Sequence, residues 1–146
     1  MTSFIVIDSN VYLATIIPDP LRQKAIDLLS QIQQKNMQVI APALFRYEIV
    51  AVLRKQSGRG VITPKQAQVG LDIMIKHAQK IQFLLDDVLL KRGFEIANQF
   101  NFPTAYDSQY LAVAEHFGCD FWAIDSRLVN IVSPTWSWVK WLGNFV

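Results

Sequence analysis

The sequence predicts one α/β domain in which a mainly parallel β-sheet carries helices on both faces. Three observations support this prediction. The 146 residues have the length of one domain, no low-complexity stretch marks a linker, and short apolar runs alternate with helical patterns along the chain. Residues 1–146 are therefore expected to form a single folded unit.

Each predicted strand is a run rich in β-branched and aromatic residues, and each predicted helix repeats apolar residues three and four positions apart. The strands fall, in order, at residues 4–7, 37–41, 81–85, 121–124 and 138–142, of which 81–85 can instead lead into the next helix. The helices fall at residues 10–17, 20–32, 42–57, 64–78, 87–100 and 104–117. Helix starts and ends are marked by capping residues, proline or glycine at Asp19–Pro20, Pro42, Gly58, Thr63–Pro64, Asp86–Asp87 and Gly118.

The composition excludes several classes of protein. Hydrophobic residues make up 51% of the chain and charged residues 18%, so it has ample apolar surface to fold and is not disordered. The longest uncharged run, 128–139, holds 12 residues and contains Pro134, whereas a membrane span needs about 20. The first strand has no basic flank and is no signal peptide. The single cysteine, Cys119, cannot form an internal disulfide, which suits a reducing cytoplasm.

Two of the 12 acidic residues directly follow predicted strands. Asp8 comes after residues 4–7, and Asp125 comes after residues 121–124. Because ligands bind at the carboxyl ends of parallel strands, both carboxylates are expected at one edge of the sheet. Each can instead cap the helix that follows it.

Two further acids lie in apolar helices. The neighbours of Glu48 at three and four positions are all apolar: Leu44, Phe45, Ala51 and Val52. An ionised carboxylate on such a face is costly unless a cation or hydrogen-bond donors compensate, and the alternative to a functional role is an ion pair with an arginine. Asp107 lies in the first turn of the predicted helix 104–117, where the helix dipole alone can account for an acid.

These four acids come from two strand ends and two helices, as in a convergent site. Gathered together they would repel one another unless a cation lay among them. Oxygen ligands alone select hard ions such as Mg²⁺ or Mn²⁺. Zinc is not expected, because Cys119, His77 and His116 show no ligand spacing.

Four segments carry the acids in a fixed order: Ile7–Asn10, Glu48 within residues 42–53, Ala105–Ala114 and Trp122–Leu128. In this order and spacing the chain resembles PIN-domain nucleases, specifically small VapC-type toxins, from Phe4 to about Leu142. The resemblance implies a PIN-like fold and places the family's catalytic and metal-binding acids on Asp8, Glu48, Asp107 and Asp125. One departure is Ala123, where many family members have Thr or Ser; the alanine removes a hydroxyl that could contact metal-bound water or substrate.

The resemblance implies a divalent-metal-dependent endoribonuclease, the toxin of a type II toxin-antitoxin pair. Mg²⁺ or Mn²⁺ held by the acids would polarise a phosphodiester of the RNA and activate a water. Neither histidine is placed for attack by a 2'-hydroxyl, so the expected products carry 5'-phosphate and 3'-hydroxyl ends. Toxins of this family are usually homodimers inhibited by an antitoxin protein, and both partners are expected here.

The charge distribution suggests where a polyanion would approach. Residues 54–92 hold 8 Lys or Arg and 3 acids, a net charge of +5, while the remainder of the chain carries −3. Arg54 and Arg59 in this basic middle, together with Arg127 beyond the last acid, are candidate substrate contacts. Ser9 and Ser126 are candidate hydroxyl donors at the same site. The alternative is that the basic residues are simply solvated helix faces.

Three tryptophans near the C-terminus, Trp136, Trp138 and Trp141, can belong either to the core or to a partner surface. Two rival functions also remain. The first is a PIN-like module that no longer cleaves and acts through protein or RNA contacts, supported only by Ala123. The second is a phosphoacceptor receiver domain, suggested by the acidic pair Asp86–Asp87. It is disfavoured because receiver domains carry their acidic pair near the first strand, whereas this pair follows residues 81–85.

Overall fold

The computed structural model describes residues 2–146, and within them five strands form one sheet in which every pairing is parallel. The strand order is β3-β2-β1-β4-β5. The strands are β1 (Phe4–Ile7), β2 (Gln38–Pro42), β3 (Gln82–Leu84), β4 (Phe121–Ala123) and β5 (Val139–Trp141). The predicted parallel α/β fold is therefore confirmed, including a strand within residues 81–85.

Seven α-helices and a short 3-10 helix connect and follow the strands in the described part of the chain. They are α1 (Ser9–Leu13), α2 (Arg22–Gln34), α3 (Leu44–Gly58), α4 (Pro64–Ala78), α5 (Asp87–Gln99), α6 (Asp107–Phe117), α7 (Ser126–Val132) and η1 (Leu142–Asn144). The cap of α4 is a full capping box between Thr63 and Gln66, and Gly118 ends α6 in the left-handed conformation that glycine tolerates.

Several predicted helix starts are early by two or three residues. The carboxylate of Asp19 accepts the Leu21 amide at 2.8 Å in a turn, so α2 begins only at Arg22. Pro42 belongs to the end of β2 rather than to α3, which starts at Leu44. In each case a local turn or strand pairing takes residues that the sequence pattern alone assigns to the helix.

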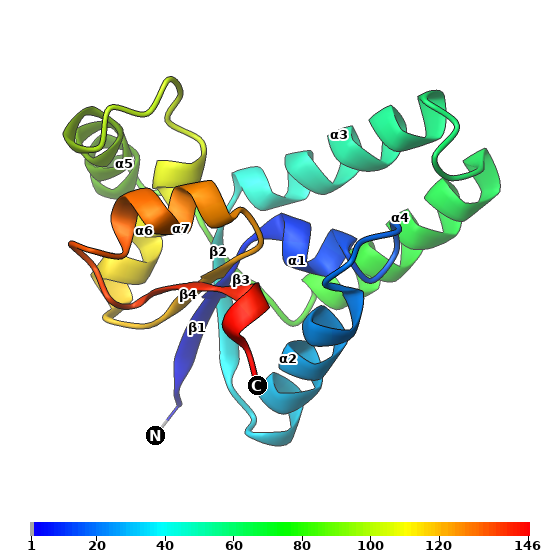
Figure 1. The fold of residues 1–146 in the computed structure, drawn as a ribbon, viewed down its shortest axis with the longest axis horizontal. Coiled ribbons are helices and arrows are strands. Elements are labelled where there is room, and N and C mark those ends of the chain that lie inside the picture. The colour runs from blue at the N-terminus through cyan, green and yellow to red at the C-terminus, as the bar shows by residue number, and fades with distance from the viewer. Residues whose placement is uncertain (1) are drawn as a thin grey trace.

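The helices cover both faces of the sheet, as predicted. In Figure 1 the sheet lies between α5, α6 and α7 on one side and α1, α2, α3 and α4 on the other. Helices α3 and α4 form a hairpin that projects from the body of the molecule (Figure 1). The exposed basic residues Arg54, Lys55, Arg59 and Lys65 lie on this hairpin, towards the turn between its helices.

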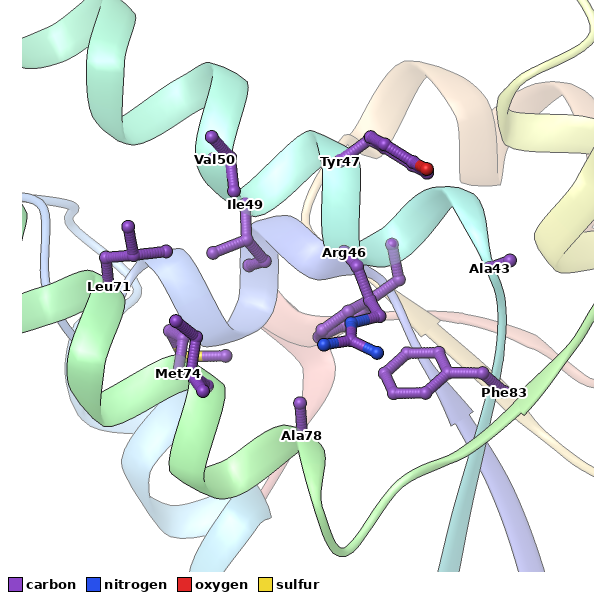
Figure 2. Close-up of a pocket in the computed structure, with 11 residues that line it drawn as sticks. Ala43, Arg46, Tyr47, Ile49, Val50, Leu71, Met74, Ala78 and Phe83 are labelled. Atoms are coloured by element: carbon purple, nitrogen blue, oxygen red, sulfur yellow. The ribbon is translucent and has the colours of Figure 1, made fainter.

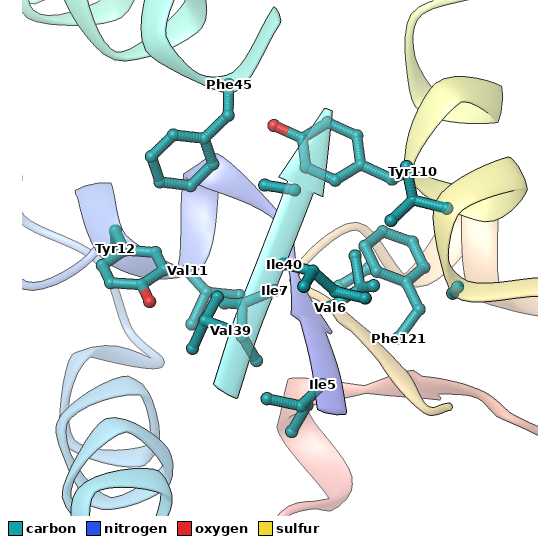
Figure 3. Close-up of a cluster of buried hydrophobic side chains, with 14 of the residues drawn as sticks. Ile5, Val6, Ile7, Val11, Tyr12, Val39, Ile40, Phe45, Tyr110 and Phe121 are labelled. Atoms are coloured by element: carbon teal, nitrogen blue, oxygen red, sulfur yellow. The ribbon is translucent and has the colours of Figure 1, made fainter. Parts of the chain in front are cut away.

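The core lies on both faces of β1 and β2 and is built from aliphatic and aromatic side chains (Figure 3). Tyr12 packs edge-on against Phe45 with ring centroids 5.4 Å apart, and Tyr110 stacks on Phe121 at 5.7 Å. Each of these four rings is at least nine-tenths buried. The core therefore fixes the ends of β1 and β4 and the starts of α3 and α6 relative to one another.

The strand order creates a crevice at the carboxyl ends of β1 and β4. The chain leaves β1 towards β2 and β3 and later returns to place β4 on the other side of β1, which is a topological switch point. The Asp8 amide donates to the Trp122 carbonyl at 3.1 Å and closes the two strand ends together. This order also differs from the 2-1-3-4-5 order of receiver domains, which excludes the receiver alternative.

The three C-terminal tryptophans are half-buried and pack against the core. Trp136 stacks on Trp138 with centroids 5.1 Å apart and meets Phe100 edge-on, while the Trp141 indole donates to the Ile124 carbonyl at 3.1 Å. These side chains therefore lie at the edge of the core, with part of each left at the surface. Within residues 2–146 no helix is long and apolar enough to span a bilayer.

Candidate active site

Asp8 is a fully enclosed carboxylate at the crevice. It follows β1 directly, is 4% exposed and caps α1 by accepting the Asn10 amide at 3.5 Å. The Ser9 hydroxyl lies 3.4 Å from the same carboxylate oxygen. The two interpretations of Asp8 from sequence, a helix cap and a residue of a site at the sheet edge, are thus compatible.

Glu48 reaches the same place from the second turn of α3. Its Oε1 accepts a hydrogen bond of 2.5 Å from the Tyr110 hydroxyl and one of 3.2 Å from the Ser9 hydroxyl. Among residues 2–146, no arginine pairs with Glu48, so the ion-pair alternative for this residue is wrong. Hydroxyl donors compensate the half-buried carboxylate instead.

Asp107 and Asp125 complete the cluster of acids, and they are more exposed to solvent than Asp8. Asp107 lies in the first turn of α6 and is exposed. Asp125 caps α7 by accepting the Arg127 amide at 2.9 Å, and the Arg127 guanidinium lies 3.7 Å from the same oxygen. Asp8, Glu48, Asp107 and Asp125 are called the acidic cluster below.

The members of the acidic cluster perturb one another. Burial raises the pKa of Asp8 to about 7, and the negative charges of Glu48 and Asp107 add to the increase. Burial raises the pKa of Glu48 and the charge of Asp107 raises it further, although hydrogen bonds from Tyr110 and Ser9 oppose both effects. Burial of one side of Asp107 and the charge of Asp125 raise the pKa of Asp107. Repulsion between neighbouring acids with raised pKa values is the electrostatic setting in which a cation binds.

The cluster offers oxygen donors but is not closed around a cation. In the described part of the chain the only ion pair of its members is the one between Asp125 and Arg127. No three His, Cys, Asp or Glu side chains among residues 2–146 are arranged to hold a metal ion as they stand. The donor set consists of carboxylate oxygens alone, which is the chemistry that a hard divalent cation prefers.

The predicted substrate contacts lie at different distances from the cluster. Ser9 is buried between Asp8 and Glu48, while Ser126 and Arg127 are exposed at the start of α7 next to Asp125. Arg54 lies six residues beyond Glu48 on α3, about 9 Å along the helix, and Arg59 follows at the end of the hairpin helix. The serine is thus placed to hold carboxylates, Arg127 lies next to Asp125, and Arg54 and Arg59 lie farther away along the α3–α4 hairpin.

The hydrogen bond from Tyr110 to Glu48 is a feature of the site that sequence analysis does not find. Its position in α6 fits the apolar face of the helix, and its ring is fully buried. The one available signal is that Tyr110 follows Asp107 by three residues, so both lie on one side of the helix.

An apolar pocket of about 520 Å³ lies apart from the cluster, between α3, α4 and β3 (Figure 2). Most of its lining comes from apolar side chains of the two helices, including Ile49, Val50 and Met74. The Arg46 guanidinium enters it and lies 5.5 Å from the centre of the Phe83 ring.

Comparison with known proteins identifies the family. Residues 5–132 match the PIN domain family, and the chain therefore belongs to the PIN domain family, as its sequence resemblance predicts. A search of curated proteins finds no match to this chain.

Two solved structures share the fold. One is VapBC2 from Rickettsia felis, solved bound to a DNA fragment from its promoter, with 13% identity, a TM-score of 0.62, and coverage of 88% of this chain and 93% of that one. The other is FitAcB from Neisseria gonorrhoeae, with 15% identity, a TM-score of 0.51, and coverage of 84% and 88%.

Proposed function

We propose that this protein is a divalent-metal-dependent endoribonuclease and the toxin of a toxin-antitoxin pair. The observation that carries the proposal is the acidic cluster at the switch point of the sheet, where burial and the charge of a neighbouring carboxylate raise the pKa values of Asp8, Glu48 and Asp107. Membership of the PIN domain family supports a nuclease at this place.

Mg²⁺ or Mn²⁺ is the proposed cofactor, held by Asp8, Glu48, Asp107 and Asp125. Hard divalent ions take carboxylate oxygens as ligands, and none of the four acids offers nitrogen or sulfur. When bound, such an ion polarises the scissile phosphodiester and lowers the pKa of a water that attacks it. A cation would also remove the repulsion that the four acids now feel.

The four acids of the cluster differ in how firmly the fold holds them. Asp8 is fixed by burial and by its place at the end of β1, and Glu48 is held by hydroxyl groups. Asp107 and Asp125 are more exposed, and they form the side of the cluster that a phosphodiester reaches first. Arg127, 90% exposed beside Asp125, is placed to bind a phosphate of the incoming RNA.

The cleavage products follow from the groups near the cluster. His77 and His116 are exposed on α4 and α6 and are not among the groups that contact the four acids. An imidazole base for attack by the RNA 2'-hydroxyl is therefore lacking at the cluster in the described residues. Attack by water leaves 5'-phosphate and 3'-hydroxyl ends.

An antitoxin and a second copy of the chain are the proposed protein partners. The names of both solved relatives denote complexes, which supports an inhibitory partner here. Large apolar side chains are exposed just after β3 and along α5, at Leu85, Val88, Leu90 and Phe94, and the pocket between α3 and α4 offers further apolar surface. Exposed apolar surface of this extent suits protein partners.

The competing function is a PIN-like module that binds RNA or protein without cleaving. Its sequence support, Ala123, is fully buried in β4, so the missing hydroxyl lies at an enclosed position. Incubation of the purified protein with mixed RNA and Mn²⁺ separates the two functions. We expect degradation that EDTA abolishes and that Asp8→Asn lacks; binding of RNA without cleavage at any Mn²⁺ concentration would favour the competing function.

A further inference from the structure

We propose that Tyr110 is a positioning residue for Glu48, because its hydroxyl holds one oxygen of the carboxylate and leaves the other available to a metal ion. The inference rests on the proposed metal-dependent function. It concerns a side chain that the sequence assigns only to the core.

The contact is short and rigidly supported. The Tyr110 hydroxyl lies 2.5 Å from Glu48 Oε1 although the two residues are 62 positions apart. The Tyr110 ring is fully buried and stacks on Phe121 with an angle of 20° between the planes. Figure 3 shows the side chain reaching from α6 towards Phe45 at the start of α3. A ring packed in this way has no freedom to move its hydroxyl away from Glu48.

Tyr110 is the dedicated donor to this carboxylate. Ser9 is the other donor to Oε1, at 3.2 Å, but its single hydroxyl hydrogen also lies within reach of Asp8 at 3.4 Å. The Tyr110 hydroxyl donates to Glu48 alone, and Oε2 of Glu48 receives no hydrogen bond from residues 2–146. Glu48 is therefore clamped through one oxygen with the second left unused.

Such a clamp prepares a ligand for a metal. A free glutamate loses rotamer freedom when it binds an ion, and a donor that fixes the carboxylate beforehand reduces that loss. Hydroxyl donors to a ligating carboxylate also orient it, and removal of such outer contacts typically costs 10- to 100-fold in metal affinity. The packing of Tyr110 on Phe121 would be equally served by phenylalanine, so the hydroxyl adds its hydrogen bond to Glu48 and its contact with the Ser9 hydroxyl.

The test measures Mn²⁺ binding to the full chain by electron paramagnetic resonance, without RNA. Tyr110→Phe keeps the stacked ring, and we expect its dissociation constant for Mn²⁺ to rise about tenfold. Tyr12→Phe is the matched control, because Tyr12 is also a buried core tyrosine and its hydroxyl has no hydrogen-bond partner among residues 2–146. Its Mn²⁺ affinity should equal that of the unchanged protein.

A double-mutant cycle separates positioning from a general structural effect. In a Glu48→Gln background, Tyr110→Phe should change the dissociation constant less than twofold, because the charged carboxylate that it positions is absent. A tenfold loss in both backgrounds, or a Tyr110→Phe variant within twofold of the unchanged protein, would overturn the inference. Failure of the unchanged protein to bind Mn²⁺ would instead overturn the proposed function together with the inference.

A measurement on the unchanged protein covers the case in which Tyr110→Phe does not fold. A tyrosine hydroxyl proton held by a carboxylate exchanges slowly and gives a downfield proton NMR resonance. We expect one such resonance, moved upfield in Glu48→Gln because a neutral amide oxygen is a weaker acceptor than a carboxylate, and retained in Tyr12→Phe. Its absence from the unchanged protein would contradict the clamp.

Discussion

Asp8 is fully buried beside Glu48, and burial together with the charge of Glu48 raises the pKa of Asp8 to about 7. A carboxyl group with this pKa is about half ionised at neutral pH, and a positive charge beside it would favour full ionisation at that pH. The relationship ties the stability of the protein to the same group that is proposed to bind the metal.

Asp8→Asn should stabilise the metal-free protein at pH 8. Because the pKa of Asp8 is higher in the folded than in the unfolded protein, its contribution to stability is complete below about pH 4 and is lost as the pH rises through about 7. The asparagine variant does not titrate, so its gain at pH 8 relative to pH 4 should be on the order of 2–4 kcal/mol. Urea unfolding in EDTA at both pH values measures it.

Asp27→Asn is the control for this experiment. Asp27 is exposed on α2, and within residues 2–146 its side chain hydrogen-bonds to Gln23 alone, so its replacement should leave the pH dependence of unfolding as it is in the unchanged protein. If Asp8→Asn unfolds with the same pH dependence as the unchanged protein, burial does not raise the pKa of Asp8 in the folded protein.

Replacing Arg54 and Arg59 together by alanine should weaken RNA binding and make it less sensitive to salt. Each lost phosphate contact lowers the slope of log affinity against log salt by about 0.7 for a single strand, so the double variant should lose about 1.4. Fluorescence anisotropy with labelled RNA in EDTA measures this slope. Lys35→Ala, at the far end of α2, should leave it unchanged. Equal slopes for all three proteins would remove the α3–α4 hairpin from the RNA path.

The RNA fragments should carry 5'-phosphate and 3'-hydroxyl ends, because water rather than the 2'-hydroxyl is the proposed nucleophile. Polynucleotide kinase should label the fragments at their 5' ends only after phosphatase treatment. Mass spectrometry of the 3' ends provides the second measurement, and a 2',3'-cyclic phosphate there would refute the proposed route.

Much of the acidic cluster is predictable from sequence because its signals are local. A run of apolar residues that ends in an acid identifies Asp8 and Asp125, and the parallel arrangement of their strands brings the two strand ends to one edge. The compensation of Glu48 is not predictable in the same way. Its donors Ser9 and Tyr110 lie 39 and 62 residues away, and the pattern of the chain offers an arginine as readily as a hydroxyl.

The details that the sequence misses are set by packing. Helix α7 has only 7 residues and too few turns to show a helical period, and the start of α2 depends on a side-chain hydrogen bond of Asp19. The apolar pocket between α3 and α4 depends on how the hairpin lies over β3, which no local pattern specifies. The packing of the tryptophans against the core depends on long-range contacts such as that of Phe100 with Trp136, which no local pattern specifies.

The most direct test of the metal-dependent nuclease is cleavage of end-labelled RNA in Mn²⁺ by Asp107→Asn beside the unchanged protein. Asp107 is exposed at the open side of the cluster, so its replacement should leave the fold and the melting temperature nearly unchanged. We predict that the variant cleaves RNA at least about 100-fold more slowly than the unchanged protein, because it lacks one ligand of the metal ion. Full activity of a folded Asp107→Asn protein would contradict the assignment of the active site to the acidic cluster.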